Sequence, residues 1–224
     1  MFLKIVYQKD ANMIKRGLLS FAGAALLSAL LFACSDSGTS AKDSFDVGVV
    51  CPADGVNAYG EPNRGTFTDE RDGQVYKYTT IGKQVWMAEN LKFETSYRYG
   101  CASPSLCTYA LKENSTRTGK LDQNRLDTLC PAGWHIPSVD EWLLLVDNMG
   151  GAKHLKRLSP DFGTDDCKFN SIGRRVDAYS ASYWTSTQYD EFWSYLAIIH
   201  NIESQPYVVY KENDQYMLVR CLKD

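Results

Sequence analysis

The chain has 224 residues, with 24 Lys and Arg against 27 Asp and Glu, so its formal net charge is −3. This length suits one domain with a hydrophobic core and a short additional segment. Binding to nucleic acid calls for a dense cationic patch, whereas the basic residues here are scattered, with Lys156-Arg157 and Arg174-Arg175 as the two adjacent pairs in the folded part. The composition therefore argues against nucleic acid as a partner.

The first 34 residues have the pattern of a bacterial export signal that ends in a cysteine. Lys15 and Arg16 precede an apolar run over residues 18–32, and the small Ala33 lies directly before Cys34. The run is shorter than the roughly 20 residues that a membrane-spanning helix needs. The pattern resembles the lipobox of bacterial lipoproteins, which implies removal of residues 1–33 as a signal peptide and lipidation of Cys34.

Two details refine this assignment. Lys4, Lys9 and Asp10 are unusual in front of an export signal, so Met13 is the predicted true start of the protein. Ser35 follows the cysteine, and in lipoprotein sorting serine at this position permits transfer to the outer membrane. We therefore expect a lipid anchor in the outer membrane and a mature chain of 191 residues that faces the periplasm or the cell surface.

Six cysteines remain once Cys34 is assigned to the anchor: Cys51, Cys101, Cys107, Cys130, Cys167 and Cys221. An even number of cysteines in an exported chain predicts up to three disulfides, for which sequence alone permits fifteen pairings. Cys101 and Cys107 are close enough in sequence to close a small surface loop, so we expect that pair. The chain has no Cys-x-x-Cys motif and three scattered histidines, so no metal site is expected.

Residues 35–47 are small and polar without apolar periodicity, which predicts a flexible tether within an extension over residues 34–64. From Gly65 onward, strands are predicted over residues 66–70, 75–81 and 84–88. The turn dipeptides Asp72-Gly73 and Gly82-Lys83 separate them, and Asp-Gly between alternating runs is a strong hairpin signal. A meander of antiparallel strands therefore opens the domain.

Ser138 and Glu141 have the spacing of a helix capping box, in which each side chain hydrogen-bonds to the backbone amide of the other residue. Apolar residues then recur at helical spacing at Trp142, Leu145, Val146 and Met149. The following Gly150-Gly151 supplies a left-handed stop. One main helix is predicted here.

The remainder of the chain again favours strands, over residues 183–188, 192–199, 207–210 and 216–221. Residues 162–182 lack clear periodicity and are predicted to be irregular. Strands on both sides of one capped helix predict an α+β domain over residues 65–224, with the helix covering one face of an antiparallel sheet.

Several sequence blocks carry a likeness to a known family: Asp72-Gly73-Gln74-Val75-Tyr76, residues 81–91 (IGKQVWMAENL), residues 130–138 (CPAGWHIPS) with Glu141-Trp142, residues 183–187 (YWTST) and residues 219–224 (VRCLKD). They closely resemble the Fibrobacter succinogenes major paralogous domain over roughly residues 65–224. Members are exported proteins, often lipoproteins, without an established biochemical activity. Their layout looks like the C-type-lectin and formylglycine-generating-enzyme fold, with long loops and a disulfide staple.

The resemblance implies a disulfide between Cys130, near the first helix, and Cys221, on the last strand. With that pair carried over, Cys51–Cys167 is the expected third pair. The chain departs from the family between residues 114 and 129, where members usually have an aromatic-rich helix. Residues 120–129 are polar here, which puts that helix in doubt.

Enzymatic and metal-dependent functions find little support in the sequence. An oxidase of the formylglycine-generating type needs two reactive cysteines near the C-terminus, and only Cys221 lies there. Ser186, His135 and Asp140 could compose a hydrolase triad, but no serine has the Gly-x-Ser-x-Gly surroundings of a nucleophile elbow, and His135 is expected to be a buried hydrogen-bonding residue.

Two short motifs suggest calcium. Glu61-Pro62-Asn63 imitates a lectin calcium motif but precedes the first predicted strand, whereas the lectin motif lies in a late loop. Asp165-Asp166 has the oxygen ligands that Ca²⁺ prefers, although a solvated acidic turn is the simpler interpretation. We therefore expect no catalysis, no cofactor and no metal.

Aromatic residues suggest a binding role instead. Flat rings with polar edges suit sugar faces and protein interfaces. Trp86, Trp134, Trp142 and Trp184 are expected in the core, and Trp193 is the tryptophan expected nearest the surface, so Trp193, Tyr189 and Phe192 form the predicted ligand-binding residues. The sequence favours a lipid-anchored binding or adhesion module for polysaccharide or protein. The alternative is a structural lipoprotein without a sugar ligand that docks on another envelope protein.

Overall fold

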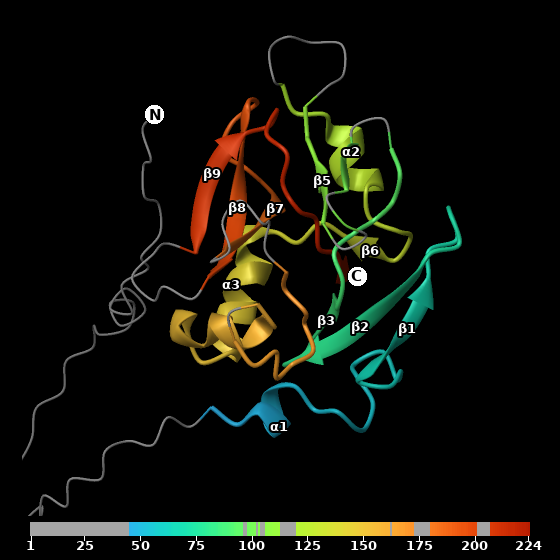
Figure 1. Cartoon of the computed structure of the whole chain (residues 1–224), viewed down its shortest axis with the longest axis vertical. Coiled ribbons are helices and arrows are strands. Elements are labelled where there is room, and N and C mark those ends of the chain that lie inside the picture. The colour runs from blue at the N-terminus through green and yellow to red at the C-terminus, as the bar shows by residue number, and fades with distance from the viewer. Residues whose placement is uncertain are drawn as a thin grey trace, which may run out of the picture. The chain divides into compact units, whose positions relative to one another are not determined.

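A computed structural model of the chain describes residues 45–95, 98–101, 103, 106–112, 120–161, 163–172, 180–200 and 207–224. This part of the chain combines short helices with antiparallel sheets (Figure 1). In chain order the elements are α1 (Val47–Val50), β1 (Arg64–Thr68), β2 (Val75–Ile81), β3 (Gln84–Met87), β4 (Arg98–Cys101), β5 (Cys107–Tyr109), α2 (Gln123–Thr128), β6 (Trp134–His135), α3 (Val139–Asn148), the 3₁₀ helix η1 (Ala152–Leu158), β7 (Ser180–Gln188), β8 (Trp193–His200), β9 (Val208–Glu212) and β10 (Leu222–Lys223). The α+β class is therefore confirmed.

A five-stranded antiparallel sheet has the order β1-β2-β3-β10-β6. Strand β2 has the predicted bounds, and both predicted turns carry a glycine at positive φ, Gly73 at 74° and Gly82 at 61°. At Gly82 a Cβ atom would also lie 2.5 Å from the side chain of Asn148, so any other residue would have to displace that side chain of α3. The glycines of the two turns and the packing of the second turn on α3 therefore stabilise the meander.

The other described sheets are β4-β5, with two strands, and β7-β8-β9, with three. Helix α3 joins the five-stranded and three-stranded sheets through one side chain. The ring of Trp142 lies 4.7 Å from that of Trp86 on β3 and stacks 5.3 Å from that of Tyr183 on β7. Trp86, Trp134, Trp142 and Trp184 are all buried, as predicted. Of the two hydrophobic clusters in the interior, the one that contains Trp86, Trp142 and Tyr183 therefore spans both sheets.

Helix α3 begins at the predicted capping box. The hydroxyl of Ser138 accepts a hydrogen bond from the amide of Glu141, and the Glu141 carboxylate accepts one from the amide of Ser138 at 2.7 Å. The helix ends before Gly150, whose φ is +75°. The buried side of α3 includes Leu145 and Val146, as the periodicity predicts.

The described part of the chain has three disulfides: Cys51–Cys167 and Cys130–Cys221 link segments far apart in the chain, and Cys101–Cys107 closes a short loop. These are the pairs expected from the loop spacing and from the family resemblance. Phe45 and Val47 pack against the core beside the first pair, so the end of the predicted tether belongs to the folded unit. Residues 1–44, which include the predicted signal peptide, Met13 and Cys34, lie outside the described residues.

Four local predictions differ from the structure. Helix α2 does form in the polar segment, because Arg125 is buried and donates to the carbonyl of Ala110 at 3.1 Å while pairing with Asp122 at 3.2 Å. Residues 216–221 make isolated bridges, and regular pairing starts only at Leu222. The helix η1 was not predicted, and β7 already begins at Ser180.

Candidate ligand-binding sites

Four aromatic rings meet on one side of the β7-β8-β9 sheet: Tyr189, Trp193, Tyr195 and Tyr210. We call them the aromatic platform. Tyr195 on β8 lies directly opposite Tyr210 on β9, and Trp193 is two residues earlier on β8, so the three side chains share a face. Tyr189, from the turn between β7 and β8, stacks on Tyr210 with centroids 4.4 Å apart and planes 8° apart. The rings thus form one connected surface.

The platform contains two of the three predicted ligand-binding residues. Trp193 meets Tyr210 edge to face at 5.7 Å, and Tyr189 is 51% exposed. Phe192 is partly buried in the turn, where its amide donates to Asp190, and it makes no ring contact with a described member of the platform. Sequence reasoning missed Tyr195 and Tyr210, although the alternation from Trp193 to Tyr195 was visible.

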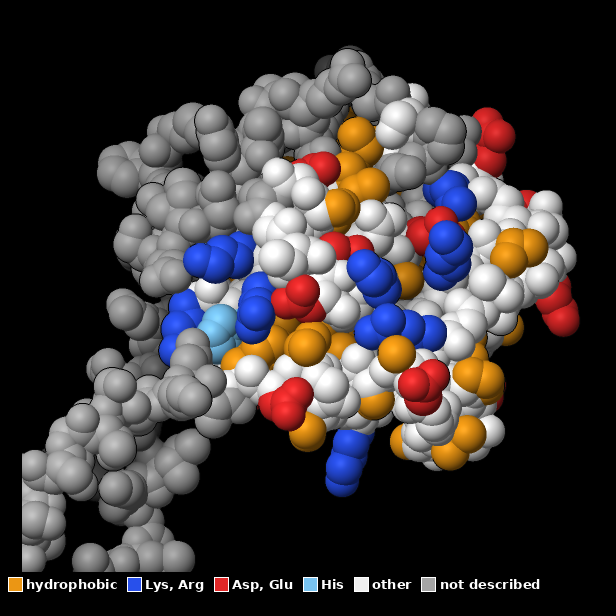
Figure 2. All heavy atoms as spheres, turned by 60° about the horizontal axis from the view of Figure 1, so that its bottom comes forward, with side chains coloured by type: hydrophobic (Ala, Val, Ile, Leu, Met, Phe, Trp, Pro, Cys, Tyr) orange, Lys and Arg blue, Asp and Glu red, His pale blue; other side chains and the backbone are white. Residues whose placement is uncertain are grey.

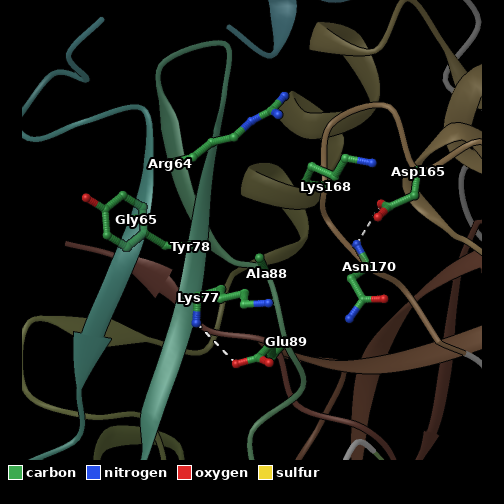
Figure 3. Close-up of a pocket in the computed structure, with 9 residues that line it drawn as sticks. All are labelled: Arg64, Gly65, Lys77, Tyr78, Ala88, Glu89, Asp165, Lys168 and Asn170. Atoms are coloured by element: carbon green, nitrogen blue, oxygen red, sulfur yellow. Dashed lines mark hydrogen bonds between the residues drawn. The ribbon is translucent and has the colours of Figure 1, made fainter. Parts of the chain in front are cut away.

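A second candidate site is a pocket formed by other elements of the fold. Figure 2 shows one face of the molecule, on which Lys and Arg side chains gather across the middle with acidic side chains among them. A pocket of about 430 Å³ lies between the strands β1 and β2, the segment after β3, and the loop that contains Asp165 and Asn170. In Figure 3, Lys77 and Glu89 stand on the strand side and face the loop across the pocket.

The loop on the far side of the pocket holds unusual backbone conformations. Asp165, Lys168 and Asn170 have φ values of 46°, 54° and 55°, in the left-handed region that non-glycine residues rarely adopt. Asp165 is also buried, and burial raises the pKa of its carboxyl, while its Oδ1 accepts a hydrogen bond from the amide of Asn170 at 2.7 Å. Each such conformation costs of order 1 kcal/mol and needs support from its surroundings.

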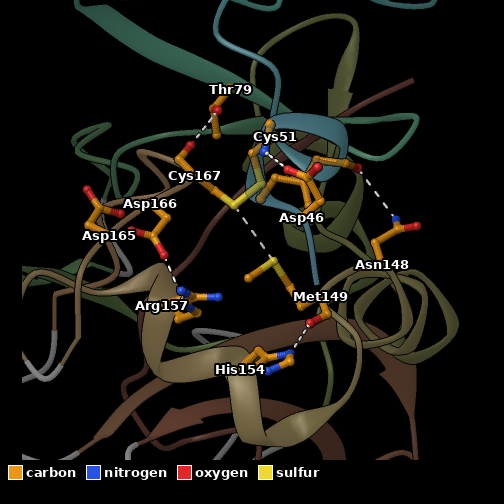
Figure 4. The surroundings of a disulfide bond; sticks show 12 residues. Asp46, Cys51, Thr79, Asn148, Met149, His154, Arg157, Asp165, Asp166 and Cys167 are labelled. Atoms are coloured by element: carbon orange, nitrogen blue, oxygen red, sulfur yellow. Dashed lines mark hydrogen bonds and ion pairs between the residues drawn. A yellow bond between two sulfur atoms is a disulfide. The ribbon is translucent and has the colours of Figure 1, made fainter. Parts of the chain in front are cut away.

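That support comes from both ends of the loop. Figure 4 shows Cys167 bonded to Cys51, while its carbonyl accepts from the hydroxyl of Thr79 at 2.6 Å. Beside it, Arg157 pairs with Asp166 at 2.9 Å. The loop wall of the pocket is therefore tied to α1, β2 and η1.

The fully buried Arg220 holds the other end of this loop. Its guanidinium donates to the carbonyls of Phe169, at 2.5 Å, and Asn170, at 3.2 Å, and also to the side chain of Asn90. It lies over the rings of Phe169 and Tyr183 at 4.5 and 5.4 Å. Burial lowers the pKa of Arg220. Acceptors surround both terminal nitrogens of its guanidinium, whereas its buried Nε has no hydrogen-bond partner among the described residues.

The sequence model of the Fibrobacter succinogenes major domain matches residues 79–223, which is more than half of the chain. The chain belongs to this family. Searches of curated proteins and of solved structures found no match to it. In the structure, this Fibrobacter succinogenes major domain also includes β1, which pairs with β2 along its whole length and precedes the matched residues.

The sequence blocks typical of the major domain meet inside the fold. Asn90 accepts from Arg220, Cys130 is bonded to Cys221, and the Trp184 indole donates to the carbonyl of Tyr109 at 2.7 Å. Except for Tyr109, these residues come from blocks far apart in the chain, and all of them are buried. These buried contacts give the residues of the blocks a structural role in the fold.

His135 belongs to the same set of blocks and is only partly buried. Its Nδ1 lies 2.6 Å from Asp224 and its Nε2 lies 2.9 Å from Glu141. The hydrogen bond with Glu141 raises the pKa of His135, burial opposes this, and Asp224 adds to it. Both ring nitrogens are engaged by carboxylates other than Asp140, so the triad of Ser186, His135 and Asp140 is not assembled.

Within the described part of the major domain, no group of three or more His, Cys, Asp and Glu side chains is arranged to hold a metal ion. Among the same residues, no helix is long and apolar enough to cross a membrane. Glu61, from the lectin-like motif, instead pairs with Lys223 at 2.5 Å. Cys34, the predicted lipidation site, lies outside the described residues.

Proposed function

We propose that the protein is a non-catalytic, lipid-anchored module of the bacterial outer membrane that binds polysaccharide through the aromatic platform. The observation that carries the proposal is the continuous set of four rings on an outer part of the β7-β8-β9 sheet. Partly exposed rings in contact with one another offer apolar faces to the C–H groups of a sugar and polar edges to its hydroxyl groups.

The geometry of the platform supports a ligand of some length. Tyr189 covers one side of Tyr210 by parallel stacking, while Trp193 and Tyr195 meet Tyr210 edge to face. Adjacent rings therefore lie at different angles, with centroid separations between 4.4 and 6.1 Å. A chain of sugar units contacts several rings at once, whereas a single sugar contacts one or two.

We further propose that the fold is C-type-lectin-like. A disulfide joins Cys130, ahead of α3, to Cys221, directly before β10, and β10 inserts between β3 and β6 in the main sheet. The opening and closing segments of the domain thereby meet in one sheet, which leaves the long connections to the exterior. Loop-rich scaffolds of this kind present binding surfaces on their connections.

The test is retention of the full chain, solubilised in detergent, on insoluble cellulose and xylan. We expect Trp193→Ala and Tyr189→Ala each to weaken retention about tenfold, because one aromatic contact contributes roughly 1.5 kcal/mol. Tyr59→Ala is the matched control, since Tyr59 is 45% exposed and lies outside the platform. Unchanged circular dichroism in each variant excludes loss of folding.

Two results contradict the proposal. One is retention that is equal in the wild type, the platform variants and the Tyr59 control. The other is the absence of retention on any polysaccharide together with stoichiometric co-purification of an envelope protein, which supports docking on a protein partner instead.

A further inference from the structure

Cationic side chains from three separate segments border the pocket of about 430 Å³ described above. Arg64 comes from β1, Lys77 from β2, and Lys168 from the loop opposite. Two carboxylates, Glu89 and Asp165, share the pocket, so cations exceed anions by one. The volume lies within the range of small-molecule sites.

The cations and the anions of the pocket differ in their local partners. Glu89 accepts a hydrogen bond from the Lys77 amide at 3.1 Å and has the ammonium of Lys92 3.9 Å away. By contrast, the ammonium groups of Lys77 and Lys168 make no direct ion pair with a carboxylate in the described part of the chain, although the charge of Lys168 acts on the nearby Asp165 carboxyl. The pocket therefore retains positive charge that an anionic ligand can neutralise.

The opposite wall supplies hydrogen-bonding groups in fixed positions. Asp165 is 9% exposed and is held by the amide of Asn170. Arg220 and the Cys51–Cys167 disulfide hold the rest of this wall in its left-handed backbone conformations. A carboxylate that is already positioned accepts hydrogen bonds from ligand hydroxyl groups at low entropic cost. Strained backbone with this much support is typical of ligand sites.

We propose that this pocket binds a sugar acid, a small ligand with one carboxylate and several hydroxyl groups. Lys77 and Lys168 bind the carboxylate from opposite sides of the pocket, while Asp165 and Asn170 hydrogen-bond to the hydroxyl groups. The inference does not rest on the aromatic platform, which uses other residues on other strands.

Both parts of the ligand are needed. A simple anion neutralises the lysines but leaves the Asp165 carboxylate and the side-chain amide of Asn170 without ligand partners. A neutral sugar engages these two residues and leaves the two ammonium groups uncompensated. Only a ligand that carries both kinds of group matches the mixed polarity of the pocket.

The experiment is isothermal titration of the full chain, solubilised in detergent, with D-glucuronate as the probe. D-glucose tests the hydroxyl groups alone, acetate tests the carboxylate alone, and inorganic phosphate tests a plain anion site. We expect saturable binding of glucuronate and at least tenfold weaker binding of the other three. Binding of glucuronate is also expected to weaken as salt is added, because charged contacts at an open pocket are screened.

Variants localise the site. Lys77 is exposed, and Lys77→Gln leaves the hydrogen bond of its backbone amide in place, so the fold is preserved. We expect Lys77→Gln and Lys168→Gln each to weaken glucuronate binding about tenfold. Lys83→Gln, at an exposed turn outside the pocket, is the matched control and is expected to bind as the wild type does.

Three results overturn the proposal. Glucuronate that binds no more tightly than glucose removes the role of the carboxylate. Phosphate that binds as tightly as glucuronate reduces the pocket to a plain anion site. Equal affinity in the wild type, Lys77→Gln and Lys168→Gln places any binding elsewhere. Trp193→Ala is expected to leave glucuronate binding unchanged, which separates this site from the polysaccharide platform.

Discussion

The contact of His135 with two carboxylates predicts that stability depends on pH. Burial opposes ionisation of Glu141, but hydrogen bonds from His135 and Ser138 outweigh it and lower the pKa of Glu141 from 4.5 to about 2. The same hydrogen bond raises the pKa of His135 above 6.5. The charged pair therefore exists in the folded state over a wider pH range than in the unfolded chain.

The direction of the effect follows from these pKa shifts. The contribution of His135 is complete below pH 6.5 and is lost as the pH rises through its higher folded-state pKa. The contribution of Glu141 is complete above pH 4.5 and is lost as the pH falls towards 2. The pair is thus most stabilising between pH 4.5 and 6.5.

The magnitude is modest because the pair is partly exposed. A fall in pKa from 4.5 to about 2 corresponds to roughly 3 kcal/mol in a fully buried site. The Glu141 side chain is 34% exposed, so solvent screens the pair, and Ser138 supplies part of the shift. We therefore assign about 1 kcal/mol to the contact between His135 and Glu141.

Urea unfolding of wild type and His135→Gln at pH 5.5 and pH 8.5 measures this contribution. We expect His135→Gln to lower the free energy of unfolding by about 1 kcal/mol at pH 5.5 and by much less at pH 8.5. Ser138→Ala is the control, because loss of the helix cap costs about 1 kcal/mol at both values. A deficit in His135→Gln that is equal at the two pH values would refute the charged-pair argument.

Two further predictions concern the cysteines. Replacing both cysteines of Cys130–Cys221 by serine should lower the free energy of unfolding by about 4–5 kcal/mol, because the pair has a sequence separation of 91. The same replacement of Cys101–Cys107, with a separation of 6, should lower it by about 2 kcal/mol. Urea unfolding measures both losses. Equal losses would contradict the chain-entropy reasoning. In a bacterial host, Cys34→Ser should move the protein from the membrane fraction to the soluble fraction and abolish palmitate labelling; membrane retention in that variant would exclude lipidation as the anchor.

Local signals were sufficient for much of the fold. The Asp72-Gly73 turn, the alternation in β2 and the capping box at Ser138 each depend on residues close in sequence, and all three were predictable. Helix α2 was not predictable, because its buried Arg125 donates a hydrogen bond to the carbonyl of Ala110, which lies outside the segment. A helix in a polar segment is not predictable when the residues that stabilise it lie elsewhere in the sequence.

The candidate sites also combine features that depend on nearby residues with features that depend on distant ones. Trp193 and Tyr189 could be chosen from their turn-rich surroundings, but Tyr210 joins them only through the register between β8 and β9. The pocket was not predictable, since Lys77 and Asp165 are far apart in sequence and line one pocket only in the folded chain, where Arg220 and a disulfide hold the loop of Asp165.

The location of the family-typical residues bears on how ligands are recognised. Residues such as Asn90, Trp184 and Arg220 contact one another or the backbone in the interior, which accounts for them without a ligand. The platform residues Trp193 and Tyr210, like most of the residues around the pocket, lie outside these sequence blocks. A scaffold specified by its interior leaves its surface residues free to differ. We therefore infer that membership of the family identifies the scaffold, and that the ligand of this chain must be sought in its own exposed aromatic and basic residues.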